Sequence, residues 1–70
     1  MNANKLKGEI TARGMTVQSF CDMYGFVRAT FDRKLSGRSE FDRDEIERII
    51  NALDLTWEDA RIIFFADPVT

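Results

Sequence analysis

The chain has 70 residues, a formal net charge of −2, one cysteine and no histidine. This length suffices for one small domain with a single core, and a lone cysteine excludes an internal disulfide framework. The absence of histidine excludes zinc sites of the Cys/His type, and we expect no cofactor and no small-molecule substrate. The N-terminus lacks the apolar segment of a signal peptide, and no run approaches the roughly 18 apolar residues of a membrane span. We therefore expect a cytoplasmic protein without a membrane partner.

The charges are unevenly distributed along the chain. Residues 1–38 carry seven basic and three acidic side chains, a net charge of +4, whereas residues 39–70 carry three basic and nine acidic ones, a net charge of −6. A molecule polarised in this way can present one face to an anion and another to solvent or a partner. An overall charge of −2 therefore does not exclude a polyanionic partner.

The apolar residues recur at intervals of three and four, which predicts an all-α fold of five short helices. The first helix is expected over about residues 4–12, with Gly14 as its stop signal. The second begins at Thr16, a residue that favours the N-cap position. The residues expected on its buried face are Val17, Phe20 and Cys21.

A third helix is expected over about residues 28–35. Gly25 ends the helix before it, because glycine readily takes the left-handed conformation found at helix C-termini. At about 100° per residue, Phe31 and Leu35 define the buried side of the third helix, with Val27 near them. The residues expected on its far side are Ala29, Asp32, Arg33 and Ser36.

The fourth helix has the strongest start signal in the chain, with Asp42 as its N-cap and Glu45 as the capping-box partner. Its inward stripe is expected to be Ile46, Ile49, Ile50 and Leu53. A last helix starts at Thr56 and is broken near its end by Pro68. Its apolar residues are Trp57, Ala60 and Ile63 or Phe64.

The sequence of residues 16–36 predicts a helix, a tight glycine turn and a second helix that starts with a cation. This is the pattern of a helix-turn-helix. The second helix of such a motif enters the DNA major groove. There Arg28 can bond guanine, Ala29 can contact a thymine methyl group and Asp32 can accept from cytosine. These three residues and Arg33 are the candidate base-reading residues. The alternative is that Arg28 and Asp32, four residues apart, form an ordinary solvated salt bridge.

Contacts with the DNA backbone are expected from the start of the second helix and from the loop after the third, because these segments usually flank the groove. The candidates are Gln18, Ser36, Arg38 and Ser39; the alternative is that they are only solvated. Lys34 lies beside the buried stripe, where its stem can cover apolar surface.

Enzymatic activity is not expected. The carboxylates of residues 40–45 lack the glycine and the spaced oxygen ligands of a calcium loop, and a compact helical domain of this size scarcely provides a catalytic cleft. Cys21 is expected to pack in the core, since no histidine is present to activate it. We therefore predict no catalytic residue and no metal site.

The run of apolar residues 62–65 exceeds what one helix face buries in so small a core. The simplest hypothesis is a two-fold homodimer through the last helix, with two recognition helices about 34 Å apart. The residues expected to form this dimer or partner surface are Ile62, Phe64 and Phe65. The alternative is that Trp57 and the apolar run close the core of a monomer.

From about Lys5 to Leu55 the chain resembles the lambda-repressor-like (Cro/C1-type, XRE) helix-turn-helix family. The shared features are a threonine that starts the second helix, a glycine turn, a recognition helix and a glycine-ended loop before a capped fourth helix. They correspond to Thr16, Gly25, residues 28–35 and Ser36-Gly37. The stretch of residues 31–41 is also similar to a signature of small phage-encoded members, F-x-R-K-L-x-G-K-S-E-F.

The resemblance implies that residues 1–70 form one compact helix-turn-helix domain, with a C-terminal helix and apolar tail over about residues 56–66. It also implies operator binding on double-stranded DNA by a phage or prophage transcriptional repressor, usually a homodimer. Two departures stand out. Val17 replaces the glutamine that commonly follows the threonine, and Val27 offers no acceptor to cap the recognition helix, which leaves amide donors for water or a DNA phosphate.

A second hypothesis belongs to a different functional class. The chain could keep the helix-turn-helix fold and use its acidic half or apolar tail to bind another protein, as an inhibitor or an antitoxin-like partner does. Only analogy of fold supports this alternative.

Overall fold

The structure, a computed structural model, describes residues 1–65, and in that range it contains five α-helices and a π-helical turn but no strand. The elements are α1 (Ala3–Ala12), α2 (Val17–Tyr24), α3 (Arg28–Leu35), α4 (Arg43–Leu53), α5 (Trp57–Ala60) and the turn η1 (Arg61–Phe65). The predicted all-α fold with five helices is confirmed. Pro68, expected to break the last helix, lies outside the described residues.

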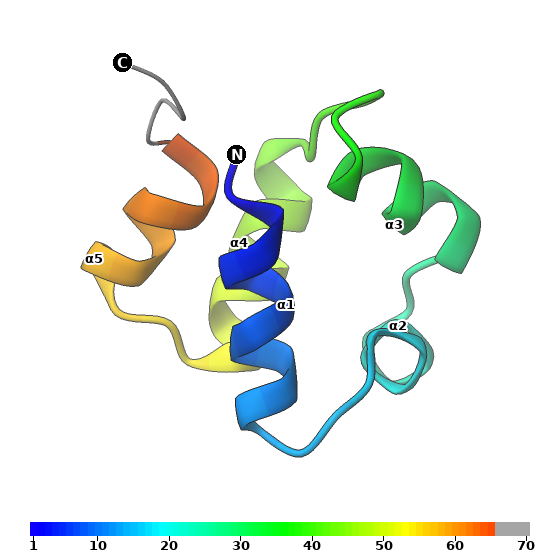
Figure 1. Cartoon of the computed structure of the whole chain (residues 1–70), viewed down its shortest axis with the longest axis horizontal. Coiled ribbons are helices and arrows are strands. Elements are labelled where there is room, and N and C mark those ends of the chain that lie inside the picture. Colours follow the sequence, from blue (N-terminus) through cyan, green and yellow to red (C-terminus); the bar gives the residue numbers. More distant parts are fainter. Residues whose placement is uncertain (66–70) are drawn as a thin grey trace.

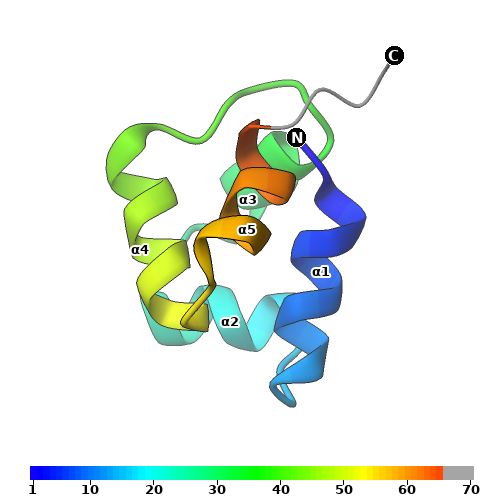
Figure 2. The ribbon, with the colours of Figure 1, turned by 90° about the vertical axis from the view of Figure 1, so that its left-hand side faces the viewer.

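Figure 1 shows the helices in three groups along the long axis of the molecule, with α5 at one end, α1 and α4 in the middle, and α2 and α3 at the other end. The view turned by 90° places α5 in front and α3 behind it (Figure 2). The candidate recognition helix and the C-terminal helix therefore lie at opposite ends of the molecule.

The core draws apolar side chains from each of the five helices and from two connecting segments. The buried residues are Leu6, Ile10, Phe20, Cys21, Phe31, Phe41, Ile49, Leu53, Leu55, Ala60 and Ile63. Partly buried residues packed against this cluster include Val17, Leu35, Ile46, Ile50 and Phe64. The inward stripe predicted for α4 is thus confirmed, with Ile49 and Leu53 at its centre.

The apolar residues Val27 and Trp57 are mostly exposed, and Val27 departs from its predicted position. Val27 was expected beside Phe31 on the buried side, yet 68% of its surface is exposed. The reason is that Val27 is the N-cap of α3 and has an extended backbone, so helical periodicity does not determine where its side chain points. Trp57 is 72% exposed. It is the first residue of α5, and its ring lies 6.4 Å from that of Phe65 at the end of η1.

The helix starts follow the local capping signals. The Thr16 hydroxyl accepts from the backbone N–H of Ser19, and the Asp42 and Glu45 side chains each accept from the backbone N–H of the other, at 2.8 and 2.9 Å. The helix expected over residues 4–12 begins slightly earlier, at Ala3, because the Asn2 side chain caps it. The predicted capping box of α4 is therefore confirmed.

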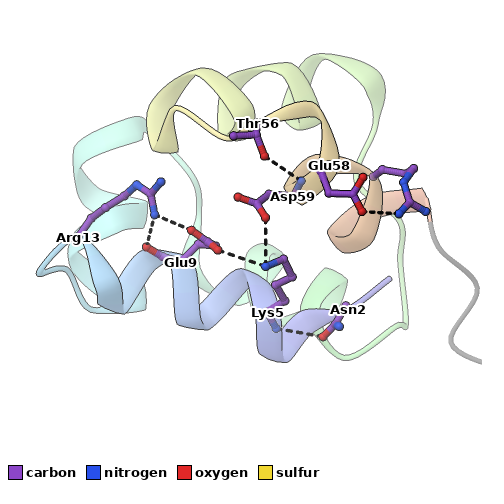
Figure 3. A network of polar contacts seen from close by, with 8 residues as sticks. Asn2, Lys5, Glu9, Arg13, Thr56, Glu58 and Asp59 are labelled. Carbon is purple, nitrogen blue, oxygen red and sulfur yellow. Dashed lines mark hydrogen bonds and ion pairs between the residues drawn. The ribbon is translucent and has the colours of Figure 1, made fainter.

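The C-terminal helix is anchored to α1 by a chain of ion pairs (Figure 3). The Lys5 ammonium lies 3.3 Å from Asp59 and 3.4 Å from Glu9, which also pairs with Arg13 at 2.7 Å. Thr56 caps α5 by accepting from the backbone N–H of Asp59. The hydrogen bond with Asp59 is the largest influence that raises the pKa of Lys5 above its ordinary value. Lys5 thus links α1 to α5 at a partly exposed position.

Candidate nucleic-acid interface

The sharp turn between α2 and α3 depends on Gly25, which has a φ of 78° in the left-handed region. Both Gly25 and Phe26 donate their backbone N–H groups to the Cys21 carbonyl. The chain then turns sharply within three residues into α3, whose bounds agree with the predicted range. Residues 17–35 therefore form a helix-turn-helix.

The four candidate base-reading residues lie together on the exposed side of α3. Phe31, between them in sequence, is 1% exposed and fixes the opposite side of the helix in the core. The far side predicted for this helix is exposed, as expected: it carries Ala29, Asp32, Arg33 and Ser36. Arg28 is exposed too. Among residues 1–65, Arg28 is the one candidate on this side whose side chain forms a hydrogen bond to another helix.

Arg28 takes part in a polar chain that joins α3 to α2. Its Nε donates to Asp32 at 2.9 Å, and its Nη1 donates to the Gln18 side-chain oxygen at 3.2 Å. Gln18 in turn donates to Asp22 at 2.9 Å. The salt bridge considered as the alternative for Arg28 and Asp32 is thus present. About half of each side chain is exposed, and such pairs contribute only about 0–1 kcal/mol, so Arg28 can exchange partners at little cost.

Arg33 and Arg38 are exposed cations at the C-terminal end of α3 and in the following loop. Within residues 1–65, neither guanidinium forms an ion pair. The Arg33 carbonyl accepts from the Ser36 hydroxyl and from the Arg38 backbone N–H, both at 3.0 Å, which orders the start of the loop. Ser39, the remaining backbone candidate, is half-buried.

Lys34 is directed away from this face. Its ammonium contacts both oxygens of the Glu45 carboxylate, at 2.6 and 2.7 Å, and lies 5.7 Å from the centre of the Phe41 ring. The side chains of the pair are only 14% and 18% exposed. The expectation that Lys34 lies along apolar surface is confirmed, and its charge ties α3 to α4.

The start of α3 has no side-chain cap, as its valine N-cap predicted. The first N–H groups of a helix lack intrahelical partners, and the helix dipole makes this end attractive to anions. Together with Arg28, these amides give the beginning of α3 positive character.

Arg48 of α4 was not identified from the sequence. It donates to the Tyr24 carbonyl at the end of α2, and its guanidinium lies 4.3 Å from the centre of the Phe26 ring in the turn. The only signal in the sequence is a cation beside the apolar stripe of α4, directly before Ile49. Its partner lies 24 residues away and cannot be inferred from spacing.

The fold and the exposed α3 define a helix-turn-helix DNA-binding protein. Residues 5–63 match the family model of the Cro/C1-type HTH DNA-binding domain. The match covers well over half of the chain, and the protein therefore belongs to this family, whose members bind double-stranded DNA and are regulators rather than enzymes. The resemblance noted in the sequence is thus confirmed.

A comparison with curated proteins found no match, and a comparison with solved structures found none either. Among residues 1–65, no helix is long and apolar enough to cross a membrane.

Proposed function

We propose that this DNA-binding protein is a transcriptional repressor that recognises an operator sequence through α3 in the major groove. The observation that carries the proposal is the exposed side of α3, where Arg28, Ala29, Asp32 and Arg33 lie together and Phe31 holds the opposite side in the core. Recognition helices of this class contact base edges with residues near their N-terminus while the other face packs on the scaffold.

Each of these side chains has a distinct role in the proposal. Arg28 donates to O6 and N7 of guanine, and Gln18 and Asp32 orient its guanidinium from two sides. Ala29 contacts a thymine methyl group, Asp32 can accept from N4 of cytosine, and Arg33 reaches a second guanine one turn along the helix.

Backbone contacts come from both sides of the groove. Arg38, exposed in the loop after α3, binds a phosphate, and Ser36 and Ser39 contribute from the same loop. Gln18, near the start of α2, contacts the phosphate backbone of the opposite DNA strand. These contacts set the register of the protein on the duplex, whereas the base contacts set its sequence preference.

The likeness of residues 31–41 to the signature of small phage-encoded members supports a phage or prophage repressor.

We also propose that the protein acts as a homodimer through its C-terminal helix. Phe65 is 57% exposed, and its ring lies 6.4 Å from that of Trp57, so the two form one exposed aromatic pair. Phe64 and Ile62 are only half-buried and extend the apolar surface, although the Phe64 ring also packs edge-on against Phe41 at 6.0 Å. An exposed apolar surface of this kind is typical of an interaction site.

The same aromatic pair favours the second candidate function, a protein-interaction module. Trp57 begins α5, which is at the opposite end of the molecule from α3 (Figures 1 and 2), whereas Phe65 of η1 lines a hollow together with Ser36 and Ser39 of the loop after α3. A partner bound on the pair would therefore lie away from the start of α3 but beside this loop.

The test of the repressor proposal is selection from a randomised pool of duplex DNA at moderate salt, with sequencing of the bound fraction. Arg28→Ala and Arg33→Ala are compared with Arg43→Ala, which removes an exposed cation whose only partner in the described residues is Glu47. We expect a palindromic motif that the two α3 variants alter or lose and that the control retains. The absence of enrichment at any salt concentration contradicts the proposal.

Salt dependence separates the two candidate functions. DNA binding should weaken with a log-log slope of about −0.9 per neutralised phosphate. Docking of a protein on the apolar pair of Trp57 and Phe65 should change little with salt.

A further inference from the structure

The turn between α2 and α3 links the two helices of the motif, and one side chain from α4 contacts it. The last carbonyls of a helix lack intrahelical partners. In α2 the Cys21 carbonyl is satisfied by Gly25 and Phe26, whereas the Tyr24 carbonyl accepts from Arg48. A cation is favoured at this position because a helix C-terminus carries partial negative charge.

The Arg48 guanidinium also packs on the aromatic residue of the turn. It lies 4.3 Å from the centre of the Phe26 ring, a distance typical of a cation–π contact. Phe26 in turn stacks on Phe20 of α2 at 5.9 Å and contacts Phe31 of α3 at 5.3 Å. Arg48 is thus connected through one ring to both helices of the motif.

The neighbouring charges leave Arg48 available for this role. Glu45, one turn earlier on α4, is occupied by Lys34 and by the backbone N–H of Asp42. In the described part of the chain, Arg48 has no ion pair. A Cβ at Gly25 would lie 3.4 Å from the guanidinium, so the side chain closes directly over the turn.

We propose that Arg48 is a positioning residue for DNA recognition: it fixes the orientation of α3 relative to α2 without itself contacting DNA. This inference rests on the proposed function of α3. A planar guanidinium can stack on Phe26 and donate to the Tyr24 carbonyl at once, which neither an ammonium nor an apolar side chain does. Loss of Arg48 therefore lowers sequence-specific affinity more than non-specific affinity.

The test compares Arg48→Met with Arg43→Met, which removes the same charge from an exposed site on the same helix. The binding of the selected operator and of a scrambled duplex is measured by fluorescence anisotropy at several salt concentrations. Arg48→Met should weaken operator binding about tenfold relative to the control, as expected for loss of a hydrogen bond from a charged donor. Binding to the scrambled duplex and the salt slope should equal those of the control.

Two results overturn the proposal. A salt slope that falls by about 0.9 relative to the control means that Arg48 contacts a phosphate. Equal operator binding by the two variants means that Arg48 does not position α3. Arg48→Lys keeps the charge and most of the stem, so it provides a second folded variant, and its operator affinity should lie between those of wild type and Arg48→Met.

An NMR measurement on the free protein separates this inference from the proposed function. In spectra of ¹⁵N-labelled protein, Arg48→Met should shift the amide signals of α3, from Arg28 to Leu35, whereas Arg43→Met should leave them unchanged. If α3 signals move but wild type selects no DNA sequence, the positioning role stands and the proposed function fails. If they do not move, the positioning role is wrong whatever the protein binds.

Discussion

The start of α3 differs from every other helix start in the described part of the chain. The other four α-helices have polar N-cap residues whose side chains accept a backbone hydrogen bond: Asn2, Thr16, Asp42 and Thr56. Val27 has the same extended backbone as Thr16 but no acceptor. At the scale of single residues, this is the point where α3 is least stabilised.

Val27→Thr should therefore stabilise the protein. A threonine at an N-cap in extended backbone accepts from the N2 or N3 amide, which is worth about 1 kcal/mol. We expect the free energy of unfolding in urea to rise by about that amount. Val27→Ala, which offers no acceptor, is the control and should show no gain; equal stability of the two variants would contradict the prediction.

Cys21 gives the protein a predictable response to alkaline pH. Burial raises the pKa of its thiol above the ordinary value of 9.0. Above pH 9 the unfolded chain loses this proton while the folded chain retains it, so the free energy of unfolding falls as the pH rises toward the folded-state pKa. Cys21→Ala should lose less stability than wild type between pH 7 and pH 10 in urea titrations. If the unfolding free energies of Cys21→Ala and wild type fall in parallel with pH, the thiol does not contribute to the pH dependence of stability.

At the scale of elements, pairs of residues far apart in sequence hold the helices together. Lys34 and Glu45 join α3 to α4, and Lys5 and Asp59 join α1 to α5. The two lysines of these ion pairs belong to the basic half of the chain, so from charge alone they would be expected to contact DNA. On the proposed function, the phosphate contacts would come from cations without an ion pair in residues 1–65, and Arg38 is the leading candidate.

Lys34→Met should change only the stability of the protein, and Arg38→Met only the salt dependence of DNA binding. Methionine at position 34 still covers Phe41 but leaves the poorly exposed Glu45 carboxylate without its cation, so we expect a loss of about 1 kcal/mol in unfolding free energy and an unchanged salt slope. Arg38→Met should leave stability unchanged and reduce the slope by about 0.9. Urea titration and binding at several salt concentrations measure both effects, and a reduced slope in Lys34→Met would contradict the assignment.

At the scale of the whole molecule, the two candidate contact surfaces lie on different elements, and they approach each other only where Phe65 and the loop after α3 line one hollow. The exposed side of α3 belongs to the basic half of the chain, and the aromatic pair of Trp57 and Phe65 belongs to the acidic half. A standard protein interface buries about 800 Å² per partner, more than two partly exposed aromatic side chains supply. A dimer formed through this pair should therefore be weak in free solution.

Sedimentation velocity tests this expectation. We expect wild type to rise above the monomer mass only at high micromolar concentration, and Trp57→Ala to remain a monomer there. Met23→Ala removes another exposed apolar side chain, 64% exposed on α2, and should behave as wild type. A wild-type monomer at high micromolar concentration removes the dimer proposal.

The features that the sequence predicted correctly are local ones. The N-caps Thr16 and Asp42, the glycine turn at Gly25 and the exposed side of α3 all depend on residues within about four positions of one another. The fold class and the position of the helix-turn-helix followed from them.

The contacts that only the tertiary structure determined join residues that are distant in the chain. Lys34 pairs with Glu45, eleven residues away, and Arg48 donates to the Tyr24 carbonyl, 24 residues away. Lys5 of α1 pairs with Asp59 of α5. By itself, the sequence determined which residues form helices and which side of α3 faces outward, because capping and helical periodicity act over one or two turns. The folded chain alone determined which cations pair with carboxylates within residues 1–65 and which side chain packs on the turn before α3, because ion pairs and stacking depend on distances in space.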